Sequence, residues 1–538
     1  MEVSLNGLKN DAEAFKKAGV KLPEYDVAAV QKYTDEHPVW IHMGAGNIYH
    51  GFIASLQQNL LNEGLQKSGI LTLSTRSSET RDKILTPHDN LEMSVTLLPD
   101  TSVEMEIIAS STHDYLFNGL YPYDEVKVRN FFHDRGLQML SFTITEKGYA
   151  LRDIEGNYLG IVAEDLKNGP AHPKHGMSIV TALLLERFSA GALPLALVSM
   201  DNCSHNGDKL KQAVVEIAQA WVANGFADKS FVEYLNDGSK VSFPCSMIDK
   251  ITPRPDPVIA DKLKALGIAG MDPIKTSKGT FIAPFVNAEK PQYLVVEDDF
   301  PNGRPQLEKV GVLFTTKDGV DLCERMKVTT CLNPLHTALA VYGCILGYER
   351  ISAEMDDDLL VALVRKLGYD EGLKVVDDPK ILNPKDFLTE VITERLTNKC
   401  LPDSPQRIAT DTSLKVPVRF GETIKNYKKK GLDASKLVAL PLAIAGWLRY
   451  LLALDDNGKS FELSDDPQIP ELKKHLEGVK FGDPASVGDK LKPILSNSTI
   501  FGSDLYAAGL AKTVEGFFAE LISGPGAVRA TLEKYLKV

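Results

Sequence analysis

The sequence lacks any apolar run long enough to cross a membrane. Its 538 residues are 43% hydrophobic and 25% charged, whereas a membrane-spanning helix needs roughly 18 or more consecutive apolar residues. Residues 1–19 mix charges with isolated apolar side chains and contain no apolar segment of the kind that secretory signals carry. We therefore expect a protein that does not bind membranes and stays in the cytoplasm.

Paired cysteines are also missing. The six cysteines, at positions 203, 245, 323, 331, 344 and 400, form no CxxC pair and show no metal-site spacing. Zinc-assisted alcohol oxidation needs about three or four clustered Cys, His or carboxylate ligands, and four of the histidines are isolated: His42, His50, His113 and His205. We predict no metal site, and we expect the cysteines to act as small buried apolar residues.

A basic stripe is absent as well. The chain has 60 Lys and Arg against 72 Asp and Glu, for a net charge of -12. The basic residues are scattered, which argues against nucleic-acid binding. We expect small-molecule partners, and an anionic substrate would need a local cationic pocket acting against the overall negative field.

The first half of the chain alternates strand-like and helix-like segments. Residues 38–75 contain a hydrophobic strand (VWIHMG), a glycine turn, an amphipathic helix (GFIASLQQNLLNEGLQKSG) and a second strand (ILTLST), as in a βαβ unit. Further strand-like runs are MSVTLL, VEMEIIAS, MLSFTIT and PLALVSM. This alternation predicts a largely parallel sheet with helices on both faces.

Helical periodicity dominates after the Pro- and Gly-rich segment DDFPNGRPQ, for example in LHTALAVYGCILGYE and ASKLVALPLAIAGWLRYLLALD. The predicted fold class is therefore α/β with two domains. Residues 1–310 are expected to form a Rossmann-type, mostly parallel sheet domain with an N-terminal extension. Residues 311–538 are expected to form a mainly α-helical substrate and catalytic domain.

The glycine turn predicts a nucleotide site. Gly44 and Gly46 lie between a strand and a helix, where glycines let a pyrophosphate approach the unpaired N–H groups of the helix. Tyr49 stands where a complete GxGxxG motif has its third glycine. Arg76 follows the second strand, and the first acid there is Glu79. We predict NAD as the cofactor, with NADP left open because Arg76 could hold a 2′-phosphate.

Two later segments concentrate polar residues among apolar ones, SMDNCSHNG at 199–207 and ERMKVTTCLNPLHTALAVYG at 324–343. Asn202 follows a strand-like run, where open α/β sheets bind ligands. Asn333 and His336 share one helix face. A desolvated Lys327 beside the start of that helix could act as a base, and the asparagine amides could hold a substrate oxygen. Taken singly, each residue also fits an ordinary turn, helix or surface position.

Together these segments resemble the mannitol dehydrogenase family, the polyol-specific long-chain dehydrogenases that include mannitol 2-dehydrogenases and fructuronate and tagaturonate reductases. The likeness covers nearly the whole chain through IHMGAGNIYHGF, TPHDNLEMSVTL, TITEKGYAL, LVSMDNCSHNG, FPCSMIDKITP, ERMKVTTCLNPLHTALA, QRIATDTSLKVP and AGWLRYLLALDDNG. It implies an N-terminal Rossmann-type domain that binds NAD(H), or less often NADP(H), and a helical domain that supplies a lysine base without a metal.

The resemblance also implies roles for single residues. Lys327 would be the base, Asn202 and Asn333 the amides that hold the oxygen, and His336 a supporting residue. Glu324 would gate a proton channel, and Asp249 and Arg395 would lie near substrate hydroxyls. The expected cofactor-binding residues are Gly44, Gly46, Asn47, Arg76 and Glu146.

This chain departs from the family pattern at His50, at Cys245 and in one spacing. Lys327 precedes Asn333 by six residues, where the usual family spacing is five. Because each residue advances a helix by about 100°, a continuous helix would swing the lysine away and put Val328 in its place. We therefore predict a π-bulge or a non-helical turn between 327 and 333.

The leading functional hypothesis is reversible hydride transfer between the cofactor and a sugar acid, fructuronate or mannonate, whose carboxylate would bind Arg395, Lys399 or Arg407. A neutral polyol such as mannitol, paired with fructose, is the alternative substrate. A hypothesis from another class is a non-catalytic nucleotide-binding sensor or scaffold. The oligomeric state is left open.

Overall fold

The computed structural model describes residues 1–537, which form two compact units. The first unit comprises Met1–Leu98 and Ser102–Asp321, and the second comprises Pro99–Thr101 and the residues from Leu322 onward. The division at 310/311 stays a prediction about domains, and each unit is described by itself below.

A six-stranded parallel sheet organises the first unit. Its strands are β2 (Trp40–Met43), β3 (Ile70–Ser74), β6 (Ser111–Leu116), β7 (Met139–Phe142), β8 (Leu195–Ser199) and β9 (Val241–Ser242), in the spatial order β6-β3-β2-β7-β8-β9. β2 pairs with β3 on one side and with β7 on the other. This order confirms the predicted Rossmann-type architecture, in which ligands bind beyond the carboxyl ends of the strands at the switch point.

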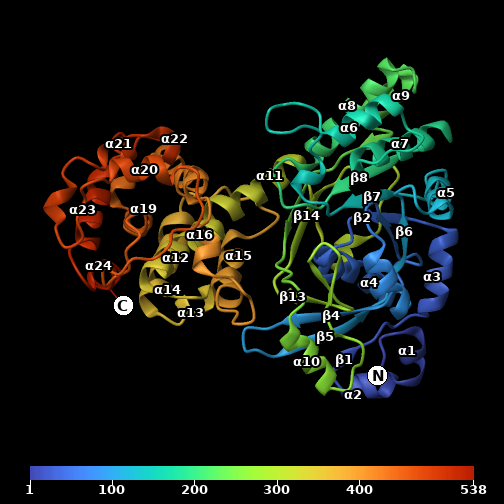
Figure 1. The fold of residues 1–538 in the computed structure, drawn as a ribbon, viewed down its shortest axis with the longest axis horizontal. Coiled ribbons are helices and arrows are strands. Elements are labelled where there is room, and N and C mark those ends of the chain that lie inside the picture. The colour runs from blue at the N-terminus through green and yellow to red at the C-terminus, as the bar shows by residue number, and fades with distance from the viewer. Residues whose placement is uncertain (538) are drawn as a thin grey trace. The chain divides into compact units, whose positions relative to one another are not determined.

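Alternate residues of each strand enter the cores on opposite faces of this sheet. Ile41 and Met43 pack in a cluster with α7 (Gly176–Ser189) and α8 (Asn206–Ala223), whereas Trp40 packs on the other face with α4 (Ala54–Asn62). The remaining helices of this unit are α1 (Leu5–Asn10), α2 (Ala12–Lys17), α3 (Val27–Glu36), α5 (Pro122–Phe131), α6 (Gly160–Asn168), α9 (Lys229–Asn236) and α10 (Pro257–Ala265) (Figure 1).

Two of the strand-like runs lie outside the parallel sheet. β4 (Glu92–Leu97) and β5 (Val103–Ile108) pair as an antiparallel hairpin in a mixed sheet of order β1-β5-β4-β13, with β1 at Val20–Lys21 and β13 at Phe285–Glu289. The connection at residues 98–102 is too short for a parallel crossover, which needs about a dozen residues. A third sheet joins β10 (Ser246–Asp249), β14 (Tyr293–Glu297) and β15 (Leu313–Thr315). β11 (Ile274–Lys275) and β12 (Phe281–Ile282) form a separate pair.

The second unit is helical, as predicted, and it is drawn in yellow to red in Figure 1. From Leu322 to residue 537 it contains no strand beyond two isolated bridges. Its core joins α12 (Asn333–Leu346), α19 (Ala439–Tyr450) and α23 (Ala511–Leu521), which pack successively on one another. The other longer helices are α14 (Asp358–Arg365), α15 (Pro384–Glu390), α18 (Glu422–Lys429), α20 (Ile469–His475) and α24 (Ala527–Leu536).

π-helical turns recur in the second unit, at η6 (Lys327–Cys331), η7 (Lys366–Gly372), η8 (Val391–Arg395) and η9 (Pro417–Gly421). Such turns appear where a helix holds one residue more than its regular repeat, frequently at functional sites. Over residues 1–537, none of the helices combines the length and the apolar character that a membrane crossing requires.

Candidate active site

The glycine turn at the end of β2 has the geometry of a phosphate cradle. Gly44 has φ +93, and a Cβ there would lie 2.5 Å from the Thr143 carbonyl oxygen, so only glycine fits. A Cβ on Gly46 would meet nothing closer than 3.9 Å. The turn is therefore closed on the sheet side at Gly44 and open at Gly46, where a pyrophosphate could approach.

The helix after the turn differs from the regular helix that the sequence predicted. It begins with the π-helical η1 (Tyr49–Ile53) before α4. Tyr49 is fully buried, stacks on His42 with ring centroids 4.3 Å apart, and donates to Ser111 Oγ at 3.1 Å. The tyrosine that replaces the third glycine is thus part of the core.

Beside the turn is a hollow of about 770 Å³ that could take a dinucleotide's adenosine end. Gly44 and Gly46 line it together with three cationic side chains, those of Arg76, Lys147 and Lys174. Its described lining residues include no Asp or Glu. Glu79, the first acid after β3, instead binds Lys83 at 2.7 Å and Ser277 Oγ at 2.8 Å.

Two predicted cofactor residues lie outside this hollow. Glu146 forms an ion pair with Lys209 and lines a different depression. Asn47 donates from its side chain to the Pro253 carbonyl oxygen at 3.2 Å. Their assignment to the cofactor therefore stays a prediction.

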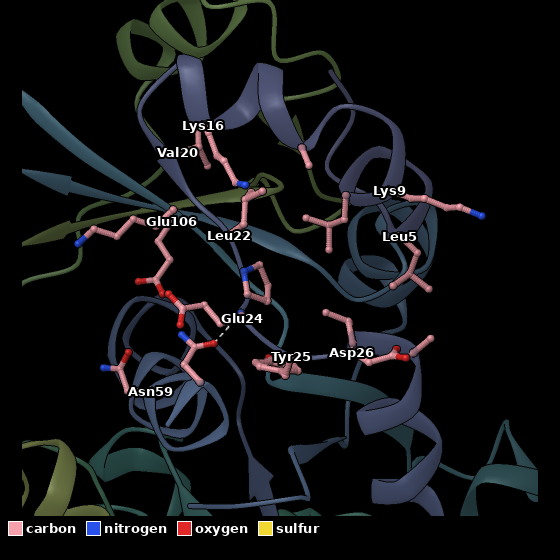
Figure 2. A pocket seen from close by; sticks show the side chains of 17 residues that line it. Leu5, Lys9, Lys16, Val20, Leu22, Glu24, Tyr25, Asp26, Asn59 and Glu106 are labelled. Carbon is pink, nitrogen blue, oxygen red and sulfur yellow. Dashed lines mark hydrogen bonds between the residues drawn. The ribbon is translucent and has the colours of Figure 1, made fainter. Parts of the chain in front are cut away.

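A larger hollow of the same unit lies elsewhere (Figure 2) and contains none of the predicted site residues. It measures about 1080 Å³ and is lined by part of the N-terminal extension, chiefly residues 20–28, together with Asn59, Asn62 and Glu106. In it the backbone N–H of Glu24 donates to Asn62 Oδ1 at 2.9 Å. The predicted catalytic, substrate-binding and cofactor-binding residues therefore all lie outside this hollow.

Asp201 fixes the loop that carries Asn202 at the carboxyl end of β8. Its carboxylate accepts hydrogen bonds from the backbone of Ile144 (3.0 Å) and Thr145 (2.8 Å) and from the Tyr149 hydroxyl (2.6 Å). Burial raises the pKa of Asp201, although these hydrogen bonds oppose the shift. Asn202 itself is exposed at the end of this tied loop.

Asn206, which the sequence analysis did not single out, joins β8 to β10. Its buried side-chain amide donates to the Asp201 and Ser246 carbonyl oxygens at 2.9 and 3.0 Å and accepts from the Ser246 N–H at 2.9 Å. Asp249, a predicted substrate residue, ends the same strand β10 and is 9% exposed. An asparagine that starts a helix gives no sequence signal for such a cross-link.

Lys327 begins the π-helical η6, and its side chain is buried. The Leu332 N–H donates to the Lys327 carbonyl oxygen at 3.1 Å, and Leu332 leaves the helical region with φ -127 and ψ -64. Pro334 explains the break, because a proline ring clashes with a continuing helix and is tolerated in a first turn. The predicted π-bulge between 327 and 333 is confirmed.

Asn333 and His336 lie in the first turn of α12, next to η6. Asp403 Oδ2 lies 3.7 Å from His336 Nε2, and this nitrogen is buried with no hydrogen-bond partner among residues 1–537. Burial lowers the pKa of His336, opposed by Asp403 and reinforced by Arg419, Arg395 and Arg407. The imidazole is therefore neutral near pH 7.

The other predicted residues of the second unit differ in their surroundings. Arg395 ends η8 and is 4% exposed, and Glu324 is half-buried in α11 (Lys317–Met326). Lys399 forms an exposed ion pair with Asp356 at 3.1 Å, and Arg407 forms one with Asp403. The charges of Lys399 and Arg407 are thus already balanced by protein carboxylates.

Arg419 was missed by the sequence analysis. It lies in η9, and its Nη1 donates to Thr337 Oγ1 at 2.6 Å, one residue after His336. The Thr337 hydroxyl in turn donates to the Asn333 carbonyl oxygen at 3.0 Å. The only sequence signal is an arginine within the short segment PVRFG.

The arrangement offers a lysine, a neutral histidine and asparagine amides, which suit proton transfer and binding of an oxygen. Within residues 1–537 no three His, Cys, Asp or Glu side chains are grouped as metal ligands. The candidate residues divide between the units, with Asn202 and Asp249 in the first and Lys327, Asn333 and His336 in the second.

Two family models match consecutive parts of the chain. The mannitol dehydrogenase Rossmann domain matches residues 39–309, and the mannitol dehydrogenase C-terminal domain matches residues 319–521. The chain is 50% identical to D-mannonate oxidoreductase of Thermotoga maritima over 527 residues, 97% of each chain. It is 29% identical to polyol:NADP oxidoreductase of Gluconobacter oxydans, covering 85% of this chain and 88% of that protein. The structure of Pseudomonas fluorescens mannitol 2-dehydrogenase with NAD and D-mannitol matches with 25% identity, full coverage of both chains and a TM-score of 0.68.

Proposed function

The chain belongs to the mannitol dehydrogenase family, and we propose that it catalyses reversible, metal-independent hydride transfer on a sugar acid, reducing fructuronate to mannonate. The observation that carries the substrate proposal is the 50% identity, over 97% of both chains, to a D-mannonate oxidoreductase. Identity to the polyol oxidoreductase of Gluconobacter oxydans is only 29%. A neutral polyol pair, mannitol and fructose, is the second candidate.

In the direction of alcohol oxidation, Lys327 Nζ accepts the hydroxyl proton of the substrate. The amides of Asn202 and Asn333 hold the resulting oxygen through hydrogen bonds. Burial of Lys327 supports this role, since an ammonium group removed from water gives up its proton more readily. In ketone reduction the same proton returns from the lysine to the oxygen.

The remaining residues support this exchange. Neutral His336 contributes a buried ring nitrogen beside Asn333. We assign Glu324, three residues before Lys327, to proton exchange with solvent, and Asp249 and Arg395 to substrate hydroxyls. The π-turn at η6 accommodates the irregular lysine spacing, so this spacing does not argue for a non-catalytic sensor or scaffold.

A nicotinamide dinucleotide bound at the Gly44–Gly46 turn would accept or supply the hydride. The open space at Gly46 fits its pyrophosphate. We propose NAD, as in the Pseudomonas fluorescens complex. Arg76, Lys147 and Lys174 also suit a 2′-phosphate, so NADP is the alternative. Initial rates with NADH and NADPH distinguish the two.

The deciding experiment is an NADH-oxidation screen over fructuronate, tagaturonate and fructose. The proposal expects the highest kcat/KM with fructuronate. A preference for fructose would overturn it in favour of a mannitol 2-dehydrogenase. Cofactor binding without turnover of any of the three would favour a sensor or scaffold.

The location that we propose is the cytoplasm. Cys245, Cys323, Cys331 and Cys344 are buried thiols, and burial raises the pKa of each. Thiols of this kind suit a reducing compartment.

A further inference from the structure

Arg419 carries a positive charge that the protein leaves unbalanced. No carboxylate of residues 1–537 lies within 4.0 Å of its guanidinium. Its hydrogen bond to Thr337 Oγ1 engages one of the five N–H donors of an arginine with a neutral acceptor. Burial lowers the pKa of Arg419 to about 10. A desolvated charge without a counter-ion destabilises a protein unless a ligand offsets it.

The segment that carries Arg419 is fixed against the proposed catalytic residues. η9 packs on both η6, which holds Lys327, and α12, which holds Asn333 and His336. A Cβ on Gly421 would lie 2.2 Å from the Phe501 carbonyl oxygen, so the end of η9 cannot shift toward that backbone. Just beyond η9, Thr423 Oγ1 donates to the Thr329 carbonyl oxygen at 3.1 Å.

A second polar group beside Arg419 also lacks a protein partner. His336 Nε2 is buried and makes no hydrogen bond within residues 1–537. Arg419 is among the charges that lower the pKa of this histidine, and it binds the neighbouring Thr337. The Arg419 guanidinium, which lacks a carboxylate partner, therefore lies near the His336 ring nitrogen, which lacks a hydrogen-bond partner. Together these two groups fit a ligand that carries both an anionic group and a hydroxyl group.

Three other cations of the second unit already have protein partners. Arg407 is paired with Asp403 and is 61% exposed. Lys399 is paired with Asp356 and is 57% exposed. Lys415 Nζ donates to the Ile408 and Thr410 carbonyl oxygens. Arg419 differs from Arg407 and Lys399 because no carboxylate of residues 1–537 lies within 4.0 Å of it. It differs from Lys415 because a guanidinium can bind a carboxylate through two parallel hydrogen bonds.

We propose that Arg419 binds the carboxylate of the substrate and thereby selects a sugar acid over the neutral sugar of the same carbon skeleton. This inference rests on the proposed function and names a residue that determines its specificity. A carboxylate can accept two parallel hydrogen bonds from a guanidinium, which a primary alcohol cannot do. Substrate binding would also balance this partly buried charge.

The test compares fructuronate with fructose, which has a CH₂OH group in place of the carboxylate. Arg419→Gln should lower kcat/KM for fructuronate by about 100-fold, as expected when one partner of a buried charge pair is lost. Fructose reduction should change by less than about threefold, because no carboxylate contact is lost. The kcat/KM of Arg419→Lys for fructuronate should lie between those of the wild type and Arg419→Gln, because lysine keeps the positive charge but lacks the planar guanidinium.

The matched control is Arg529→Gln, which removes an arginine that is paired with Asp357 at 2.9 Å. This variant should leave unchanged the ratio of kcat/KM for fructuronate to kcat/KM for fructose. Mannonate, but not mannitol, should raise the thermal midpoint of the wild-type protein, and Arg419→Gln should lose this shift. A folded Arg419→Gln protein that keeps the wild-type ratio, or that loses both activities equally, overturns the inference.

Different results would contradict the proposed function and the assignment of Arg419. If the wild-type enzyme prefers fructose, the proposed function fails before any variant is made. If the wild-type enzyme prefers fructuronate and Arg419→Lys keeps the full preference together with the mannonate shift, only the assignment of Arg419 fails. Arg419→Lys also decides the matter if the glutamine variant does not fold.

Discussion

The backbone N–H of Leu332 donates to the carbonyl oxygen of Lys327, five residues earlier, at 3.1 Å. A regular helix would bond to the residue four positions earlier. The extra residue between Lys327 and Asn333 is therefore absorbed locally, and the lysine stays buried.

Deleting Val328 should convert η6 to a regular helical turn and leave Lys327 facing the same way. We expect kcat to fall by less than about 100-fold, the cost of a misplacement of roughly 1 Å. Inserting an alanine after Val328 is the matched control, and it should turn the lysine away and inactivate the enzyme. Stopped-flow or steady-state rates on fructuronate check both, and equal inactivity of the two variants would contradict the role of the π-turn.

Replacing Lys327 with Ala should lower kcat by about 10² to 10⁴, the usual contribution of a general base. Cofactor affinity, measured by NADH fluorescence titration, should persist because the glycine turn is in the other unit. Lys317→Ala provides the control, since Lys317 is ion-paired with Asp208 at the surface. Unchanged turnover in Lys327→Ala would refute the assignment.

Alanine substitutions at the two glycines of the turn should have different effects, one on stability and the other on cofactor binding. Gly44→Ala forces a side chain to φ +93 and against the Thr143 carbonyl oxygen, so the protein should be destabilised by about 2 kcal/mol or more. Gly46→Ala meets no protein atom closer than 3.9 Å, so it should fold normally and bind the cofactor weakly. Urea unfolding and NADH titration measure the two effects, and normal cofactor affinity in Gly46→Ala would remove the phosphate role.

The burial of the Glu354 carboxyl group predicts that the free energy of unfolding depends on pH. Its carboxyl group is fully buried, neither oxygen has a hydrogen-bond partner among residues 1–537, and burial raises its pKa well above 4.5. The folded state therefore keeps a proton that the unfolded chain releases above about pH 4.5, and this contribution to stability is lost as the pH rises.

Glu354→Gln should abolish that loss. The stability of the variant relative to the wild type should increase between pH 5 and pH 8, by at most about 1.4 kcal/mol per pH unit. Urea midpoints at several pH values test this, with the exposed Glu13→Gln as the control. Parallel pH profiles for Glu354→Gln and the wild type would show that the carboxyl is not held protonated.

Local patterns predicted the elements that depend on neighbouring residues. The strand, glycine turn and second strand of residues 38–75 follow from hydrophobic runs and glycines close in sequence. The π-turn follows from one residue more than the spacing that the family resemblance implies. β6 was not predicted, because its sequence STHDYL begins with four consecutive polar residues and lacks the hydrophobic run of the other strands.

Features that depend on distant packing could not be predicted. The separate sheet of β4 and β5 depends on pairing with β13, nearly two hundred positions later in the chain. Arg419 is significant only because η9 packs on η6 and α12. Asn206, at the start of α8, matters because its amide reaches Ser246 on β10. No motif in the sequence marks either residue.

The hydrogen bonds of Asp201 to Ile144, Thr145 and Tyr149 form within the folded first unit. The conformational entropy of the chain around Asn202 is therefore lost during folding. If the substrate contacts Asn202, as proposed, its binding does not have to order this loop again, so more of its intrinsic binding energy remains as affinity. Under that proposal, the buried Asp201 carboxylate favours ligand binding without touching the ligand, because the loop is ordered during folding and not during recognition.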